Sequence, residues 1–433
     1  MRSVLALALT AAAVVLLPPA TPASAEAAPA AALSPAIRVR DGRLVEANGS
    51  DLVLRGVNHD FIWYPDKNGV FAAIKAAGAN AVRVPLGMGH QFRQTKPEEV
   101  ATIASLCRQN RLVCILDAHD TTGWGQDKKA TTIAEAVRFW TGLLPQLRGQ
   151  EDHIIINVAN EPFGVGGDWP WVQQTSDALR RLRAAGFRHT LMVDAPGWGQ
   201  DEAFVMRDNA AKVRAADPTG NTVFDVHMYG EFDNAAKVNS YLTTFARNKL
   251  PIIIGEFSGE HQWGDPDEDA IMAYAEAHDV GYFGWSWSGN QSQYSYLDLV
   301  HNFDPASRTA WGNRFLTGPN GISTDTREAT IFRNGTAGAS TAPRGAPVQL
   351  KVVDVTPGTV RLTWKRGTSG TTYQVVAVHG ASESRIVSTG SADVTLRGLN
   401  GSTEYTFAVY ARGLLGTRSP RSAPVYAITP PAV

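Results

Sequence analysis

Eight short apolar runs recur between residues 52 and 285, and this repeat constrains the fold more than any other feature of the chain. The segments between the runs have helical spacing or are rich in Ala, Leu and Arg, which favour helices. Strands that alternate with helices imply a parallel sheet. The runs cover residues 52–57, 81–84, 113–116, 154–158, 190–193, 223–226, 251–254 and 281–285.

Eight strand–helix repeats predict a closed barrel, since an α/β barrel of eight such repeats takes about 250 residues or more. We therefore predict an α/β fold in which a (β/α)8 TIM barrel spans residues 37–333. An open doubly wound sheet is the alternative. The glycine fingerprint with which such a sheet binds a dinucleotide is missing after the first strand.

The first 25 residues have the features of an export signal. Arg2 supplies a positive start, residues 4–17 form an apolar run, and Ala23-Ser24-Ala25 fits a cleavage site. The run is shorter than the roughly 20 residues of a bilayer span, although a short membrane anchor is the alternative. We predict a signal peptide over residues 1–25 and a secreted, extracellular protein that binds no membrane.

A linker and a second domain follow the predicted barrel. Gly, Ala, Ser, Thr and Pro dominate residues 334–346, as is typical of linkers. Val360, Leu362 and Trp364 then alternate with polar residues, which predicts a small all-β sandwich over residues 347–430. This segment resembles a fibronectin type III domain, and a spacer role is favoured over weak carbohydrate binding.

Composition excludes several classes of function. Lys plus Arg number 40 and Asp plus Glu 41, so the chain lacks the basic excess that nucleic-acid binding requires. Two cysteines exclude a disulfide scaffold and any four-cysteine zinc site. Cys107 and Cys114 favour a disulfide in an exported chain, with two buried thiols as the alternative.

Polar or aromatic residues end nearly every predicted strand, and the carboxyl ends of barrel strands converge on one face. Glu161 and Glu256 end the fourth and seventh runs. Either glutamate alone could be a structural ion-pair partner. Two of them among His, Arg, Tyr and Trp, without a cluster of metal ligands, indicate the carboxylate pair that glycoside hydrolysis needs.

Competing chemistries fit the sequence poorly. The chain has no Gly-x-Ser-x-Gly elbow for a serine hydrolase and no His-Glu-x-x-His for a metalloprotease. We therefore expect neither a metal nor a cofactor. Ten of the 11 Trp precede the linker, and several follow strand ends, where rings can stack on sugars. Trp63, Trp198, Trp285 and Trp287 are the candidates from this group, whereas Trp140 and Trp311 are predicted core residues.

The predicted barrel resembles glycoside hydrolase family 5, and within it the bacterial endo-β-1,4-mannanases. The matching motifs include Arg-Gly-Val-Asn-His at 55–59, Asn-Glu-Pro at 160–162, Gly-Glu-Phe at 255–257 and Trp-Ser-Trp-Ser-Gly-Asn at 285–290. The chain departs from the related mannanases at residues 59–63, where they carry a second His, and again after Tyr229.

The resemblance implies a role for each matching residue. Glu161 corresponds to the acid/base and Glu256 to the nucleophile of a retaining double displacement. Arg83 corresponds to the residue that orients the nucleophile, and Asn160 to the one that binds the sugar 2-hydroxyl. His119, His227 and Tyr229 correspond to residues that make polar contacts around the cleaved sugar. Trp285 corresponds to the ring on which that sugar stacks.

Simple electrostatics adds two expectations about the carboxylates. A crowded apolar site with a second carboxylate nearby should raise the pKa of the acid Glu161. Pairing with Arg83 should keep Glu256 ionised.

The sequence as a whole therefore predicts a monomeric, secreted, retaining endo-β-1,4-mannanase that acts on β-mannan or a related plant polysaccharide. The first alternative is an endo-β-1,4-glucanase of the same family, and the second is a carbohydrate-binding barrel without activity.

Overall fold

The computed structural model describes residues 36–166, 169–332, 347–365, 372–379, 382–412, 419 and 421–431. The predicted signal peptide (1–25) and linker (334–346) lie outside these residues. Within the described part of the chain, every helix is too short or too polar to cross a bilayer.

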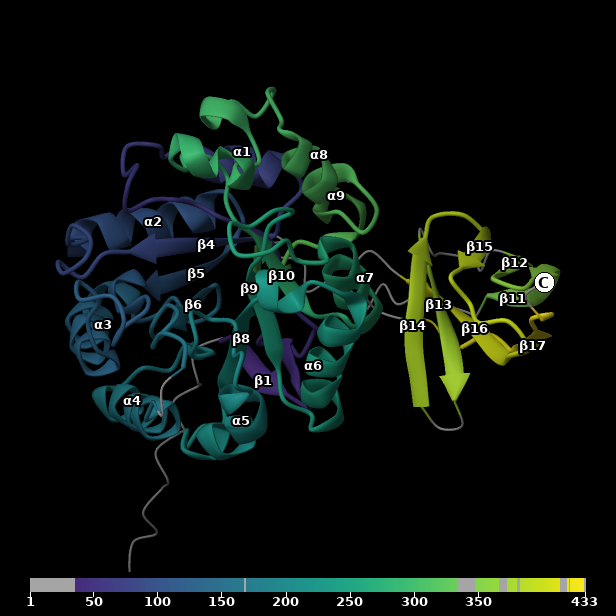
Figure 1. The fold of residues 1–433 in the computed structure, drawn as a ribbon, viewed down its shortest axis with the longest axis horizontal. Coiled ribbons are helices and arrows are strands. Elements are labelled where there is room, and N and C mark those ends of the chain that lie inside the picture. Colours follow the sequence, from purple (N-terminus) through teal and green to yellow (C-terminus); the bar gives the residue numbers. More distant parts are fainter. Residues whose placement is uncertain are drawn as a thin grey trace, which may run out of the picture. The chain divides into compact units, whose positions relative to one another are not determined.

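Eight parallel strands close into a barrel in the order β10-β3-β4-β5-β6-β7-β8-β9, which confirms the predicted fold (Figure 1). The strand that closes the ring is β10, which pairs with β9 on one side and β3 on the other. The strands are β3 (Arg55–Asn58), β4 (Ala81–Leu86), β5 (Val113–Ala118), β6 (Ile154–Asn157), β7 (Thr190–Asp194), β8 (Thr222–His227), β9 (Ile252–Glu256) and β10 (Gly281–Gly284).

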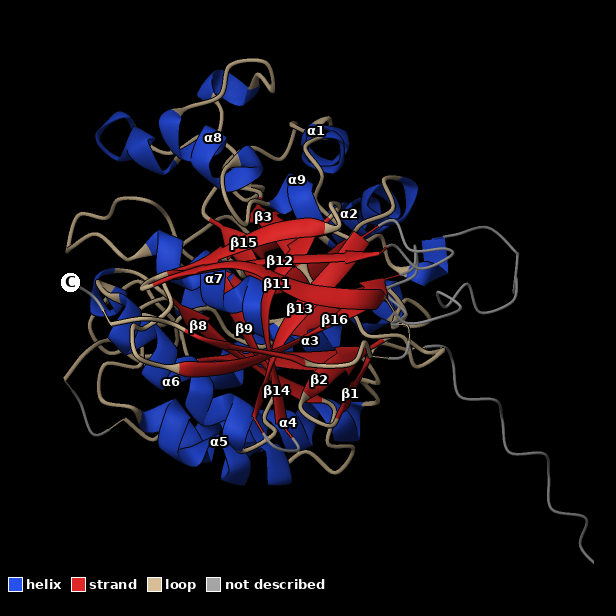
Figure 2. Ribbon diagram, turned by 90° about the vertical axis from the view of Figure 1, so that its right-hand side faces the viewer, coloured by secondary structure: helices blue, strands red, loops and turns tan. Residues whose placement is uncertain are grey.

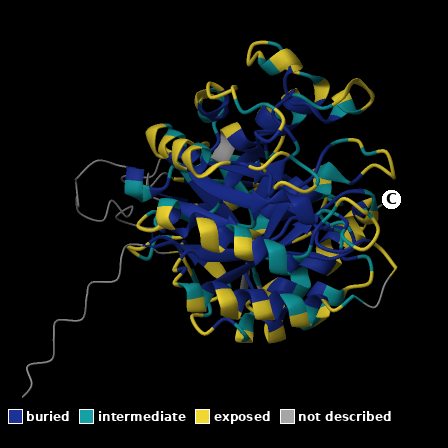
Figure 3. Cartoon of the chain, turned by 90° about the vertical axis from the view of Figure 1, so that its left-hand side faces the viewer, coloured by how far each residue is buried: buried dark blue, intermediate teal, exposed yellow. Residues whose placement is uncertain are grey.

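Helices surround the barrel and pack their apolar faces against the strands. In Figure 3 the barrel strands are buried and the helices expose their outer faces. The helix starts follow local chemistry: Thr132, Asn234 and Asp267 each accept a bond from a backbone N–H of the helix that follows. The helices are α1 (Val70–Ala76), α2 (Pro97–Gln109), α3 (Ile133–Leu147), α4 (Trp171–Ala185), α5 (Val205–Ala215), α6 (Ala235–Arg247), α7 (Glu268–His278), α8 (Ala310–Thr317) and α9 (Ile322–Asp325).

The half of the barrel at the amino ends of the strands is filled with apolar side chains. Ile115, Ile155, Ile253 and Phe283 belong to this core, together with residues of the hairpin β1 (Arg38–Arg40) and β2 (Arg43–Val45). Phe283 packs so closely on Gly56 that a Cβ at Gly56 would lie 2.2 Å from its ring. Since active sites of such barrels lie at the carboxyl ends of the strands, this packed half supports the site from below.

Cys107 lies in the last turn of α2 and Cys114 lies in β5, and both are buried free thiols. The favoured disulfide is therefore not formed in this structure, and the alternative of two buried thiols holds. Burial and the neighbouring Cys114 sulfur raise the pKa of Cys107 well above its usual value, so this thiol is protonated and packs as a small apolar group.

The small domain consists of two antiparallel sheets, and its strands are among those drawn in red in Figure 2. Val360, Leu362 and Trp364 are buried, and Tyr373 and Phe407 join them in one core, so the predicted period-two alternation is confirmed. The strands are β11 (Val348–Thr356), β12 (Thr359–Lys365), β13 (Thr372–His379), β14 (Ser382–Thr389), β15 (Asp393–Arg397), β16 (Glu404–Arg412) and β17 (Val425–Ile428).

Candidate active site

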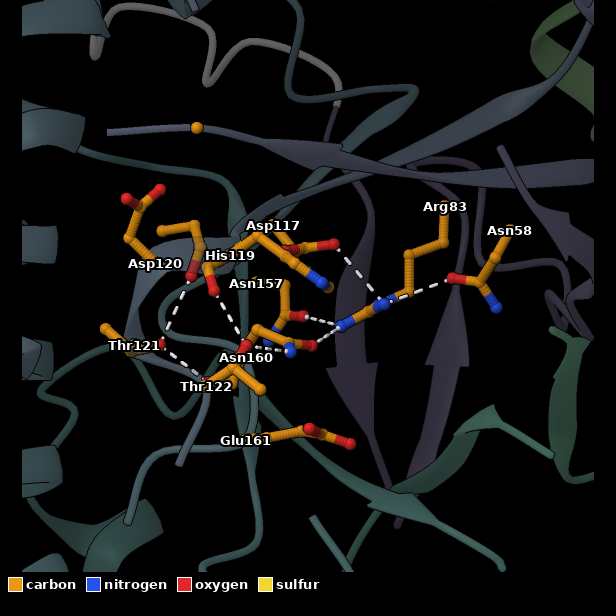
Figure 4. A network of polar contacts seen from close by, with 12 residues as sticks. Asn58, Arg83, Asp117, His119, Asp120, Thr121, Thr122, Asn157, Asn160 and Glu161 are labelled. Atoms are coloured by element: carbon orange, nitrogen blue, oxygen red, sulfur yellow. Dashed lines mark hydrogen bonds and ion pairs between the residues drawn. The ribbon is translucent and has the colours of Figure 1, made fainter. Parts of the chain in front are cut away.

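Arg83, on β4, lies at the centre of a polar layer just above the apolar core (Figure 4). Its guanidinium donates to Asn58 Oδ1 at 3.1 Å, to Asn157 Oδ1 at 2.9 Å and to Asn160 Oδ1 at 2.5 Å. Asp117 Oδ2 lies 3.3 Å away. Burial alone would lower the pKa of Arg83, but the surrounding carboxylates outweigh it and raise the pKa further. Arg83 is therefore a permanent buried cation.

Glu256 ends β9 and accepts two hydrogen bonds from fixed donors. Arg83 Nη1 donates to Oε1 at 2.7 Å, and Tyr229 Oη donates to Oε2 at 2.9 Å. Burial raises the pKa of Glu256, whereas His227 and Arg83 act to lower it, and burial prevails. The expected effect of Arg83 is present, but it is too small to bring the pKa of Glu256 down to its usual value. Both donors nevertheless favour the carboxylate form.

Glu161 follows β6 and is the more accessible of the two glutamates, with 12 % of its side chain exposed against 6 % for Glu256. Its backbone is held on both sides: its N–H donates to Asp194 Oδ2 at 3.0 Å and its C=O accepts from the N–H of Gly123 at 3.0 Å. Its φ of 39° lies in the left-handed region, which is costly for a residue with a Cβ. These bonds fix the direction in which the carboxylate leaves the strand.

The two glutamates lie close together. One carboxylate oxygen of Glu161, one of Glu256 and one ring nitrogen of His227 all lie within 4.8 Å of one another. Retaining glycosidases place their carboxyl groups about 5–5.5 Å apart, and inverting ones about 6.5–9.5 Å apart to admit a water. The spacing in this barrel matches the retaining geometry.

His227 ends β8 and bridges the pair. Its Nδ1 lies 2.7 Å from Glu161 Oε1 and 3.5 Å from Glu256 Oε2, and its Nε2 lies 3.4 Å from Asp225 Oδ2. Burial would lower the pKa of His227, but the charge of Glu256 and the bonds to Asp225 and Glu161 raise it well above its usual value. A cationic His227 reduces the repulsion between the two glutamates, which lets them stay close.

His119, Trp285 and Trp63 form an aromatic wall beside the glutamates. The rings of His119 and Trp285 are nearly parallel, with centroids 6.0 Å apart, and Trp63 meets both edge-on. His119 Nδ1 lies 3.0 Å from Asp117 Oδ1, and Trp63 is 44 % exposed. These three rings directly follow β5 and β10 or lie in the loop after β3, as the sequence predicted for the face at the carboxyl ends of the strands.

A directed chain of hydrogen bonds holds Trp285 from behind. Its Nε1 donates to Asn290 Oδ1 at 3.2 Å, Asn290 Nδ2 donates to Ser286 Oγ at 2.9 Å, and Ser286 Oγ donates to Asp60 Oδ2 at 3.0 Å. Asp60 is 2 % exposed. Burial raises its pKa well above the usual value, and Asp298 and Glu256 add to the effect. Asp60 lies in the segment 59–63, where the sequence was expected to depart from the related mannanases.

The structure separates the candidate tryptophans. Trp198 is partly exposed and donates to Gln126 Oε1 at 2.8 Å. The prediction that Trp287 binds the substrate is wrong. Its side chain is 1 % exposed and belongs to the apolar core, so its ring cannot contact a sugar. Trp171, which also follows a strand, is fully buried. Trp140 and Trp311 are core residues, as predicted.

Sequence reasoning assigned no role to several residues that the structure brings to the site. Asp117 and Asn157 contact Arg83, and Asp60 supports Trp285 through Ser286. Asp117 carries a signal that could have been read, since an ionisable residue inside an apolar strand must find a buried partner. Asn157 also follows a strongly apolar run.

Two groups of described side chains could in principle hold a metal ion. They are Glu161 with His227 and Glu256, and Asp194 with Asp225 and His227. Both groups share His227, and in each group this imidazole already pairs with the carboxylates.

A buried arginine beneath two close glutamates, at the carboxyl ends of eight barrel strands, is the site of a retaining glycoside hydrolase. Residues 45–291 match the family described as "Cellulase (glycosyl hydrolase family 5)". The chain belongs to this family, as its sequence suggested. Residues 345–428 match the fibronectin type III domain.

The chain is similar to several proteins named as mannanases. A mannan endo-1,4-beta-mannosidase of Streptomyces lividans is 50 % identical over 72 % of this chain and 82 % of its own length. One of Cellvibrio japonicus is 44 % identical over 70 % of this chain and 73 % of its own. The mannohexaose complex of the Thermomonospora fusca beta-mannanase is a solved structure with a TM-score of 0.67 and 50 % identity, covering 69 % of this chain and 99 % of that one.

Proposed function

We propose that this protein is a retaining endo-β-1,4-mannanase in which Glu161 is the acid/base and Glu256 the nucleophile. The observation that carries the proposal is the close pair of carboxylates, one oxygen of each within 4.8 Å of the other. Glu256 suits the nucleophile because Arg83 and Tyr229 both donate to it. Glu161 suits the acid/base because it is more exposed and lacks a guanidinium partner among the described residues.

The reaction then proceeds in two displacements. In the first, a Glu256 oxygen attacks the anomeric carbon while protonated Glu161 gives its proton to the departing glycosidic oxygen, so the C–O bond breaks and a glycosyl ester forms on Glu256. In the second, Glu161 removes a proton from water, the water oxygen attacks the anomeric carbon, and the ester bond to Glu256 breaks. Two inversions leave the anomeric configuration unchanged.

Arg83 and Asn160 prepare the first displacement. Arg83 fixes Glu256 Oε1 and also binds Asn160 Oδ1, so the Asn160 amide nitrogen points away from the arginine. That nitrogen donates to Thr122 Oγ1 at 2.8 Å and has a second hydrogen for a sugar hydroxyl. Trp285, Trp63 and His119 supply the wall on which the cleaved sugar stacks.

The substrate class rests on the relatives that are 44–50 % identical to this chain and whose names specify mannan. A β-1,4-glucanase remains the alternative, since the family also includes cellulases. Comparing hydrolysis of galactomannan and of carboxymethylcellulose by reducing-sugar release separates the two. We expect release from galactomannan. Release of reducing sugar from carboxymethylcellulose alone would overturn the assignment of mannan as the substrate. Release from neither polysaccharide would favour a carbohydrate-binding barrel without activity.

The wider organisation is also a proposal. The barrel domain spans residues 37–333 and the sandwich residues 347–430, joined by the linker at 334–346. Export through the segment at 1–25 would place a monomeric enzyme outside the cell, where plant mannan is found. Mass determination of the secreted protein tests this, because cleavage after Ala25 would leave Glu26 as the first residue.

A further inference from the structure

Asp194 ends β7 and is buried in the polar layer of the site, with 1 % of the residue exposed. Its two carboxylate oxygens have different partners. Oδ2 accepts from the backbone N–H of Glu161 at 3.0 Å, and Oδ1 accepts from Nδ2 of Asn157 at 2.5 Å. Its own backbone is also fixed, because the buried indole of Trp171 donates to the C=O of Asp194 at 2.8 Å. The carboxyl group therefore has a set position beside the two glutamates.

A continuous path of hydrogen bonds runs through Asp194 from one glutamate to the other. A guanidinium can only donate, so the amide oxygen of Asn157 faces Arg83, at 2.9 Å, and its amide nitrogen faces Asp194 (Figure 4). Arg83 in turn donates to Glu256 Oε1 at 2.7 Å. Asn157 and Arg83 are both 0 % exposed, so water does not compete for these bonds. The backbone of Glu161 and the carboxylate of Glu256 are thus held in one network.

Glu161 depends on this support because its backbone conformation is unfavourable. A φ of 39° in a residue with a Cβ costs about 1–3 kcal/mol, and it persists only where the surroundings impose it. Two bonds impose it here, from the Glu161 N–H to Asp194 and from the N–H of Gly123 to the Glu161 C=O. Of these two bonds, the one to Asp194 involves a side chain, so a substitution can remove it.

The support does not depend on the charge of Asp194. Burial and the charge of Asp225 raise the pKa of Asp194 well above its usual value, whereas His227 and Arg83 act to lower it. His227 Nε2 lies 3.6 Å from Asp194 Oδ2, and Arg83 Nη2 lies 3.7 Å from it. A carboxyl group in either protonation state keeps an oxygen that can accept the N–H of Glu161.

We propose that Asp194 is a positioning residue, which sets the direction of the acid/base Glu161 relative to the nucleophile Glu256. This inference rests on the proposed function, which gives the two glutamates these roles. A general acid must lie within hydrogen-bond reach of the leaving oxygen, and a misplacement of about 1 Å can cost about 10²-fold in rate. Asp194 contacts the backbone of Glu161 and not its carboxylate, so its loss should affect the step that uses the acid.

The variant Asp194→Ala tests the proposal with two substrates that differ in their leaving group. Mannohexaose needs a proton on its leaving oxygen, whereas a dinitrophenyl β-mannobioside needs none in the first displacement. The ratio kcat/KM reports the first displacement for both substrates. It should fall about 10²-fold for mannohexaose and stay nearly unchanged for the dinitrophenyl substrate.

Asp194→Asn is the conservative variant. It keeps one acceptor oxygen and loses one of the two bonds, so kcat/KM for mannohexaose should fall only about tenfold. If Asp194→Ala does not fold, the same comparison of substrates with Asp194→Asn decides the question.

Asp201→Asn is the matched control. Asp201 is also 1 % exposed and accepts from backbone N–H groups, those of Met206 and Arg207 at the start of α5. This variant should leave kcat/KM unchanged for both substrates.

Two results would overturn the positioning role. They are equal losses on both substrates when Asp194 is replaced, which would indicate a merely structural residue, and no loss on mannohexaose. Failure of the unaltered enzyme to cleave either substrate would instead overturn the proposed function, so the two failures are distinguishable.

Discussion

The carboxylates of Glu161 and Glu256 lie within 4.8 Å of each other, and the imidazole of His227 contacts both. Two carboxylates this close repel each other unless a cation or a shared proton intervenes. His227, whose pKa is raised by these same charges, supplies that cation. The spacing leaves no room for a water between the glutamates and a sugar, so direct attack by one of them is the chemistry that fits.

The loss of activity on replacing Glu161 with Ala should depend strongly on the leaving group of the substrate. With mannohexaose, which needs a proton on its leaving oxygen, kcat should fall by about 10²–10⁴. With a dinitrophenyl mannoside the first step needs no acid, so it should survive and added azide should speed turnover. Steady-state kinetics with both substrates checks this. Glu98→Ala, which changes an exposed glutamate in the first turn of α2, is the control and should retain full activity.

Replacing Tyr229 with Phe should change the pH dependence of the reaction. The Tyr229 hydroxyl donates to Glu256 Oε2 and favours the carboxylate, so its loss should raise the pKa of Glu256 further. Glu256 must be ionised to attack, and kcat/KM falls on the acid side as it becomes protonated. The acid limb of the kcat/KM profile should therefore move to higher pH. A limb that stays in place would show that another group controls it.

Replacing Asp60 with Ala should loosen the platform that Trp285 provides. The variant removes the acceptor at the end of the Trp285–Asn290–Ser286 chain, and KM for mannohexaose should rise about five- to tenfold. Asp60→Asn keeps an acceptor oxygen and should restore most of the affinity. If both variants lose affinity and thermal stability in parallel, Asp60 is only a structural residue and the positioning role is wrong.

Much of this site could be predicted because a barrel gathers its strand ends at one face. Arg83, Asn160, Glu161 and Glu256 lie far apart in the sequence, yet each falls in or just after an apolar run, and the structure brings them together. The order of eight strands is enough for this, since the fold converts strand order into position.

The rest depends on contacts that a single sequence does not reveal. Trp285 and Trp287 are two residues apart and were predicted to face the same cleft, but β10 ends at Gly284, so strand alternation no longer applies. One ring lines the cleft and the other is buried. Likewise, Asp60 meets Ser286 across 226 residues, and nothing in the local pattern of either residue indicates the other.

Stability should depend on an ion pair far from the active site. Arg183 donates to both oxygens of Asp217, at 3.0 and 2.9 Å. Burial opposes the charge, but the bonds from Arg183, Thr219 and Thr222 prevail and lower the pKa of Asp217 to about 2. The stabilisation is therefore complete above the ordinary carboxyl pKa of about 4 and is lost as the pH falls toward 2.

Asp217→Ala should accordingly lower the free energy of unfolding by about 3 kcal/mol at pH 7, because it leaves a buried guanidinium without its partner. Urea unfolding of both proteins between pH 7 and pH 3 checks this. The gap should narrow below pH 4. A gap that is constant across this range would mean that packing, and not the charge pair, is what the variant loses.

The anomeric configuration of the first product tests the central claim most directly. Proton NMR during the first minutes of mannohexaose cleavage distinguishes the β from the α reducing end before mutarotation mixes them. Attack by Glu256 followed by attack of water predicts that the β anomer appears first and the α anomer only later. Initial release of the α anomer would contradict the double displacement and, with it, the roles assigned to Glu161 and Glu256.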